Sequence, residues 1–229
     1  MDMLFRLGRR LRQIVPWRVA GLHPGMVESV QQTSAATRGE AMYFQFGPQK
    51  IVEAIAVLIR ASDSCDRPHM GCLRLLKLLY IADRESLRET GSPIIGTKPV
   101  AMDYGPLHSD AYDIIKGSRW DADTWAAFLH KAGNEVFVIK NPGVLNLSRY
   151  EIDKLTETVD RYRDRNEWDL VNITHEFQEW KKNQPEPGGS KAIPMEDLID
   201  AVGLTHMKDE ILRDMEETRK LNSVFGMPS

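Results

Sequence analysis

The feature that most constrains the fold is a helical pattern of apolar residues between His69 and Arg88, in the segment HMGCLRLLKLLYIADRESLR. Apolar side chains recur there at intervals of three or four residues, which places them on one face of an α-helix: Leu73, Leu76, Leu79, Tyr80 and Leu87. Gly91 follows, and glycine readily adopts the left-handed conformation that ends a helix. The segment therefore predicts a long amphipathic helix with one buried face.

One acidic residue, Asp83, interrupts the apolar face of this helix. At about 100° per residue, Asp83 falls among the apolar side chains, opposite a stripe that we expect to face solvent: Arg74, Lys77, Arg84 and Arg88. A carboxylate on an apolar face is costly unless it accepts hydrogen bonds. We expect its donors within residues 91–106, either backbone N–H groups or the Tyr104 hydroxyl. Asp83 is interpreted as a structural clamp on that segment, with a catalytic acid or base as the alternative.

Beyond residue 47, the chain reads as further helices and two short strands. Ser148 and Glu151 form a capping box, Ser109 is expected to cap a helix, and Gly105 and Pro106 are expected to form a turn. The fold class we predict is α+β, mostly α-helical, with one small two- or three-stranded antiparallel sheet. Its helices are expected over 48–62, 109–117, 123–131, 148–162, 168–180, 194–203 and 205–222, and its strands are KPVAMDY (98–104) and EVFVIK (135–140).

Charge divides the chain near residue 42. Residues 1–41 carry six arginines against three acidic residues, a formal +3, so the rest of the chain carries −6 of the overall −3. We interpret 1–41 as a basic, disordered N-terminal extension, 42–203 as the folded domain, and 204–229 as a charged C-terminal helix and tail. The alternatives are a helix that binds nucleic acid or a membrane surface, an arm that binds another protein, or sequence ahead of a later start at Met26 or Met42. The acidic remainder is a poor electrostatic match for nucleic acid.

The sequence also disfavours a membrane-spanning or disulfide-bonded protein. No apolar run approaches the ~20 residues that a membrane span requires. The two cysteines, Cys65 and Cys72, have no partners at zinc-finger spacing. We therefore predict neither a disulfide nor a zinc site, and a cytoplasmic location.

The segment YGPLHSDAYD holds the side chains best suited to chemistry. His108 could act with Asp83, Asp110 and His175 in a hydrolase or a metal-dependent enzyme. However, the patterns H-E-x-x-H, G-x-S-x-G and the phosphate-binding loop are all missing. A turn and a helix N-terminus explain the same residues, since aspartates favour the first turn. We therefore predict no metal, no cofactor and no small-molecule substrate.

Several blocks of the sequence together resemble one known family. They are K-L-L-Y-x-A-D at 77–83, G-x-P-I-x-G at 91–96, A-M-x-Y-G-P at 101–106, the helix that bears Tyr112, and I-P-x-E-D-L at 193–198. The pattern is similar to that of the Panacea domain, also called the SocA-like antitoxin domain. The resemblance extends over residues 44–203 and leaves both ends of the chain outside it.

The resemblance implies an antitoxin of a bacterial or phage toxin–antitoxin pair. Such a protein neutralises a cognate protein toxin by direct contact and is not an enzyme. One family member also delivers its toxin to the ClpXP protease, so a ClpXP-type protease is a second expected partner. Asp83 and the turn at Tyr104, Gly105 and Pro106 are the most recognisable residues of the family, and a structural clamp accounts for them without catalysis.

A toxin-binding surface is expected in two places. One is the surface around Tyr104, His108 and Tyr112; the other is the narrow apolar stripe of the last helix, formed by Met207, Ile211 and Met215. The stripe could instead cover the chain's own core. The alternatives to an antitoxin are the hydrolase or metal enzyme described above, and a DNA- or membrane-associated regulator that acts through the arginine-rich N-terminus.

Overall fold

The computed structural model describes residues 47–62, 67–118 and 125–224. The predicted extension over residues 1–41 and the cysteine at position 65 lie outside the described residues. The described chain is mostly helical with small antiparallel sheets, so the predicted α+β class is confirmed. Among the described helices, none is long and apolar enough to cross a membrane.

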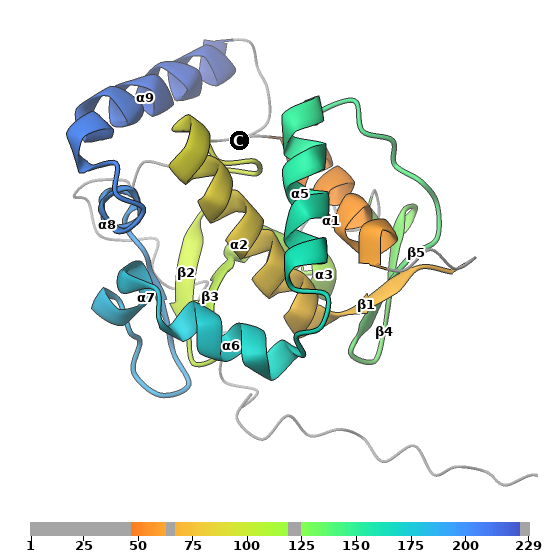
Figure 1. Cartoon of the computed structure of the whole chain (residues 1–229). Coiled ribbons are helices and arrows are strands. Elements are labelled where there is room, and N and C mark those ends of the chain that lie inside the picture. Colours follow the sequence, from red (N-terminus) through yellow and green to blue (C-terminus); the bar gives the residue numbers. More distant parts are fainter. Residues whose placement is uncertain (1–46, 63–66, 119–124, 225–229) are drawn as a thin grey trace, which may run out of the picture. The chain divides into compact units, whose positions relative to one another are not determined.

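Helix α2 (Cys72–Thr90) is the central element of the fold. It packs against α1 (Pro48–Ser62) and α5 (Arg149–Arg161), and also against strand β3 (Gly105–His108) (Figure 1). Gly91 ends α2 as predicted, with φ of 74° and its N–H donating to the Leu87 carbonyl at 2.9 Å. Because neighbours surround α2, nearly all of its turns contribute to the core and not only one face.

The predicted start of this helix was wrong. His69–Gly71 forms strand β1, which pairs antiparallel with β5 (Glu135–Val138). The Cys72 N–H, at the first helical residue, donates to the Asn134 carbonyl at 2.8 Å. Pairing with a segment more than sixty residues away thus keeps this stretch extended, and helical periodicity alone could not reveal it.

The predicted single sheet was also wrong, because the two predicted strands belong to different sheets. One sheet has the order β1-β5-β4, where β4 is Leu129–Ala132. The other has the order β3-β2-β6, where β2 is Pro99–Met102 and β6 is Ser190–Ala192. The added strands are three or four residues long and lie in segments that read as helix or loop, so their sequences carry little strand pattern.

Three local predictions need correction, two of them at the β2–β3 hairpin. The turn is at Asp103 and Tyr104, while Gly105 and Pro106 begin β3. Ser109 is the first residue of α3 (Ser109–Lys116) and not its cap, since its hydroxyl donates to the Lys98 carbonyl at 3.2 Å. Of the helix expected over 123–131, residues 123 and 124 lie outside the described residues, and β4 occupies the chain from residue 129.

The C-terminal half follows the predicted order with one break. Ser148 and Glu151 form the predicted capping box of α5. The helix expected over 168–180 is split into α6 (Glu167–His175) and α7 (Gln178–Lys182). Helix α8 (Met195–Ala201) and α9 (Lys208–Val224) then form a second apolar cluster with the end of α2.

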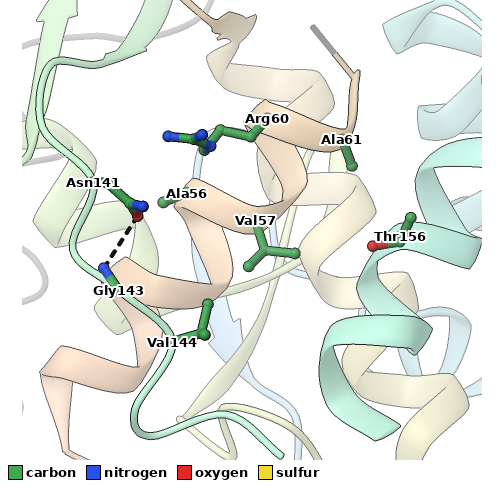
Figure 2. A pocket seen from close by; sticks show the side chains of 8 residues that line it. All are labelled: Ala56, Val57, Arg60, Ala61, Asn141, Gly143, Val144 and Thr156. Atoms are coloured by element: carbon green, nitrogen blue, oxygen red, sulfur yellow. Dashed lines mark hydrogen bonds between the residues drawn. The ribbon is translucent and has the colours of Figure 1, made fainter. Parts of the chain in front are cut away.

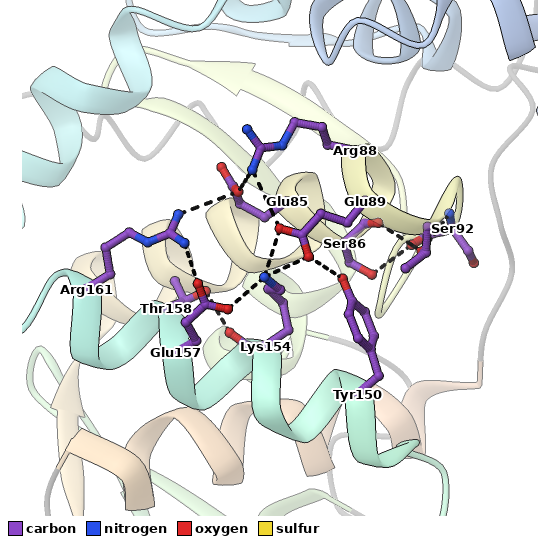
Figure 3. A network of polar contacts seen from close by, with 11 residues as sticks. Glu85, Ser86, Arg88, Glu89, Ser92, Tyr150, Lys154, Glu157, Thr158 and Arg161 are labelled. Atoms are coloured by element: carbon purple, nitrogen blue, oxygen red, sulfur yellow. Dashed lines mark hydrogen bonds and ion pairs between the residues drawn. The ribbon is translucent and has the colours of Figure 1, made fainter.

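Charged and polar side chains join α2 to α5 (Figure 3). Lys154 is buried at 6% exposure, and its Nζ lies 2.9 Å from Glu89 Oε1 and 2.7 Å from Glu157 Oε2. The Tyr150 hydroxyl donates to the same Glu89 carboxylate at 2.8 Å. Nη1 of Arg161 lies 3.5 Å from Oε2 of Glu85. These contacts fix α5 along the C-terminal half of α2.

Candidate functional site

Asp83 joins α2 to two segments of the chain. Its side chain is buried at 3% exposure, and Oδ1 accepts a hydrogen bond from the Ile95 N–H at 2.6 Å. Oδ2 lies 3.1 Å from Nε2 of His108, without the alignment of a hydrogen bond. The sequence predicted a backbone donor within residues 91–106, and Ile95 supplies one. It did not predict the imidazole of His108 at the end of β3.

His108 is itself an interior residue. Its side chain is 2% exposed, and Nδ1 lies 3.3 Å from the Thr97 carbonyl oxygen. The centroid of its ring is 5.3 Å from that of the Tyr80 ring. Asp83, Thr97 and Tyr80 thus surround it. In this structure His108 cannot contribute to an exposed binding surface, so its place in the predicted surface is corrected.

Lys77 was predicted to face solvent, and this was wrong. It is fully buried, and its Nζ donates to the Pro106 carbonyl at 2.7 Å. Burial lowers the pKa of Lys77 to about 7. The helical wheel failed because β3 covers the basic stripe of α2 at this level. The signal that could have revealed it is the run LLKLL, because a helix that is apolar on all sides is an interior helix.

Gly105 packs closely against residues of α2 and α6. Its φ is +90°, and a Cβ at this position would lie 2.7 Å from Thr174 Oγ1 and 3.0 Å from Lys77 Nζ. Both the backbone conformation and the space therefore require glycine. The sequence assigned Gly105 to a turn, but its close packing depends on residues from two distant helices.

Three backbone carbonyls of the hairpin each contact a side chain from a different helix. The Trp180 Nε1–H donates to the Met102 carbonyl at 3.1 Å, and His175 Nε2 lies 3.1 Å from the Asp103 carbonyl oxygen. His175 stacks on Trp180 with ring centroids 4.0 Å apart. With Lys77 on Pro106, these contacts tie the hairpin to α7, α6 and α2. The pKa of His175 is lowered, chiefly by burial and also by the charge of Lys77.

A further buried acid, Glu179, was missed from the sequence. It is 1% exposed, and its Oε1 accepts hydrogen bonds from the Tyr80 hydroxyl at 3.2 Å and from Arg84 Nε at 2.8 Å. Arg84 also donates to the Ala201 carbonyl at 3.2 Å, which links α8 to α2. Burial and the Glu179 carboxylate raise the pKa of Tyr80. Glu179 therefore links α7 to the centre of the fold.

The four residues of the predicted enzyme site do not form an open cleft. Asp83 and His108 meet in the interior, whereas His175 contacts the Asp103 carbonyl in the hairpin turn and Asp110 lies in the first turn of α3. A cavity of about 310 Å³ lies elsewhere, between α1, the 141–144 segment and Thr156 of α5 (Figure 2). Within the described residues, no cluster of three His, Cys, Asp or Glu side chains could hold a metal ion.

The predicted binding surface is only partly exposed. Ile211 and Met215 are buried at 4% and 1% and pack with α8 and Leu87. The alternative interpretation, that the last helix covers the chain's own core, describes this packing. Tyr104, Tyr112 and Met207 are half-buried. Tyr104 meets Trp168 edge-on at 5.6 Å, and Trp168 is 49% exposed.

Comparison with protein families matches residues 75–181 to the antitoxin SocA-like, Panacea domain. The matched range begins within α2 and ends within α7, so it includes the hairpin and the helices that hold it. Helices α1, α8 and α9 lie outside the match. Comparisons with curated proteins and with solved structures gave no significant match.

Proposed function

The chain carries an antitoxin SocA-like Panacea domain over residues 75–181, and on that premise we propose that it is the antitoxin of a toxin–antitoxin pair, which neutralises a cognate protein toxin by binding it directly. The family match is the observation that carries the proposal. We also propose that the protein acts in the cytoplasm without a cofactor, and that nucleic acid, membranes and small molecules are not its ligands.

The geometry around the hairpin supports a binding role over catalysis. Asp83 and His108, the pair best suited to acid–base chemistry, are 3% and 2% exposed, and a substrate could reach neither without local opening. Their contacts hold the 94–97 segment and β3 against α2. We therefore propose that Asp83, together with Tyr104, Gly105 and Pro106, serves as a structural clamp that shapes the domain.

A second part of the proposal concerns the fate of the toxin. We propose that the chain can also present its bound toxin to a ClpXP-type protease. In that case the toxin's half-life in cells should shorten when the chain and the protease are both present. Removing either one should restore the longer half-life, as measured by pulse–chase labelling.

Co-expression with the product of the adjacent gene tests the proposed function. We expect that product to arrest growth alone, and the chain to restore growth and to co-purify with it. Asp83→Ala should reduce the amount of folded chain, as judged by thermal unfolding, because it leaves the Ile95 N–H without its acceptor. A harmless neighbour, or arrest that persists beside abundant folded chain, contradicts the proposal.

A further inference from the structure

An apolar surface that the predicted sites do not include lies on the segment between β5 and α5. Ile139, Val144 and Leu145 are 58%, 43% and 95% exposed, and they occur within seven consecutive residues. Elsewhere in the described chain, the exposed large apolar side chains are Tyr150 and Trp168, which lie on different helices, and Trp168 also contacts the half-buried Tyr104. Clustered exposed apolar side chains are typical of interaction sites, whereas isolated ones are normal on any surface.

The 139–145 loop is held in place by hydrogen bonds at both ends. The Ile139 N–H donates to the Phe128 carbonyl at 2.9 Å, and the Gly143 N–H to the Asn141 side chain at 3.1 Å. Just beyond the loop, the backbone and side-chain amides of Asn146 both donate to Glu53 at 2.8 Å. The loop is thus preorganised, which lowers the entropy lost on binding.

The residue that accepts the Asn146 hydrogen bonds, Glu53, is a buried acid. It lies on α1 at 1% exposure, and a buried carboxylate is tolerated only when it accepts several hydrogen bonds. Two of its donors come from Asn146, and Gln49 Nε2 lies 3.4 Å away. A buried carboxyl group of α1 therefore anchors Asn146, the residue that follows Leu145, and the Leu145 side chain is 95% exposed.

Behind the loop lies the cavity of about 310 Å³ (Figure 2). Ala56, Val57 and Ala61 of α1, with Val144 of the loop, give it small apolar walls. Its size is at the lower end of the range for small-molecule pockets, and it suits one or two inserted side chains. Among the described lining residues, Arg60 is the cation and none is an acid. Arg60 forms no ion pair with another described residue.

We propose that the 139–145 loop and this cavity form the toxin-docking surface, which receives an apolar side chain of the toxin flanked by a carboxylate. The inference rests on the proposed function. The apolar walls select the inserted side chain, and Arg60 selects an acidic neighbour over a basic one. Leu145 contacts the toxin outside the cavity, at the centre of the interface, where truncation has its largest effect.

Affinity for the purified product of the adjacent gene tests this surface. Leu145→Asp is expected to weaken binding by about 30-fold or more, since it places a charge at the proposed interface centre. Ala61→Phe, which fills the cavity without adding charge, should also weaken it. Arg60→Glu should weaken binding by about tenfold and reduce its dependence on salt. Thermal unfolding should change little for Leu145→Asp, because that side chain is 95% exposed.

Trp168→Asp is the matched control, since it places the same charge on an exposed apolar residue of α6. It should leave affinity within about threefold of the wild type. If Trp168→Asp abolishes binding and Leu145→Asp does not, the surface near Tyr104 is the interface and this inference is wrong. If the chain alone forms a dimer that Leu145→Asp dissociates, the loop binds a second copy instead, which also overturns it.

The two proposals fail in different ways. A wild-type chain that neither binds nor rescues removes the proposed function and, with it, the docking surface. A wild-type chain that binds and rescues, with Leu145→Asp and Ala61→Phe equally effective, leaves the antitoxin role intact and overturns the docking surface alone.

Discussion

Lys77 is an amine held in the interior by one carbonyl oxygen. Burial lowers its pKa to about 7 in the folded chain, against 10.5 for an ordinary lysine. Between these two pH values the unfolded chain binds more protons than the folded one, so stability rises with pH. Below pH 7 both forms are protonated, and the cost of burying the charge is fully present.

This linkage predicts the effect of pH on the free energy of unfolding. From pH 7 to 9 we expect the contribution of Lys77 to rise by about 2 kcal/mol, and Lys77→Met should remove that rise. Burial raises the pKa of the Cys72 thiol and acts in the opposite direction, but the wild type and the variant share Cys72. Urea unfolding at several pH values measures the difference.

The exposed residue Lys191 provides the control. Lys191→Met should keep the dependence of wild-type stability on pH, because this side chain is already in water. Equal slopes for the wild type and Lys77→Met would contradict the assignment of the rise to Lys77.

Asp83 and Lys77 show what a sequence reveals about single residues. The need of Asp83 for donors was predictable, because an acid on an apolar helix face requires them and the following segment can supply them. The burial of Lys77 was not predictable from the helical wheel. Pro106, in the strand that covers Lys77, is 29 residues away in the sequence. A helical wheel shows which side of a helix a residue is on, but not which other elements pack against that side.

Among the elements, the α2–α5 contact combines apolar packing with a network of charges. Lys154 stands between Glu89 and Glu157, and its side chain is more buried than either carboxylate. An ion pair of intermediate burial contributes more than a surface pair, because water screens it less. The network therefore adds specificity to the way α5 sits on α2 (Figure 3).

Replacing Lys154 by methionine tests this network. The substitution keeps the length of the side chain and removes its charge, and we expect a loss of about 1–2 kcal/mol in the free energy of unfolding. High salt should shrink the difference from the wild type. A double-mutant cycle with Glu89→Gln isolates the pair itself.

Arg163 serves as the comparison, because its pair with Asp160 is exposed on both sides. Arg163→Met should cost less than about 0.5 kcal/mol. If Lys154→Met and Arg163→Met lower the free energy of unfolding equally, the burial of Lys154 does not strengthen its ion pairs.

The capping box that begins α5 was predictable, because its two residues are three apart in the sequence. The pairing of Lys154 with Glu89 was not, because these residues are 65 apart and meet only in the folded chain.

For the whole molecule, the folded unit exceeds the range that matches the family. The main core combines α1 residues such as Ile51 and Ile55 with those of α2 and α5, and a second cluster joins Leu87 to α8 and α9. Fold class followed from helical periodicity. Strand pairing did not, because partners such as His69 and Phe137 meet only after the helices between them have packed.

The isolated fragment 75–181 should therefore fail to fold. The fragment lacks α1, and with it apolar side chains that are fully buried in the whole chain, including Ile55 and Leu58. Their loss leaves the core that they pack against uncovered. We expect no cooperative thermal transition and weak dispersion of amide proton signals in its nuclear magnetic resonance spectrum. The chain without residues 1–41 is the comparison, and a cooperative transition there supports the predicted boundary at residue 42. A cooperative fragment 75–181 would contradict the role of α1.

The contacts that hold the β2–β3 hairpin also set an order of events during synthesis. The carbonyl of Met102 receives its donor from Trp180, 78 residues later. At about 5–20 residues per second, a ribosome takes roughly 4–16 s to add those residues. The 139–145 loop leaves the ribosome before Trp180 does. A nascent chain thus already carries its apolar loop while the hairpin still lacks one of the three helices that contact its carbonyls.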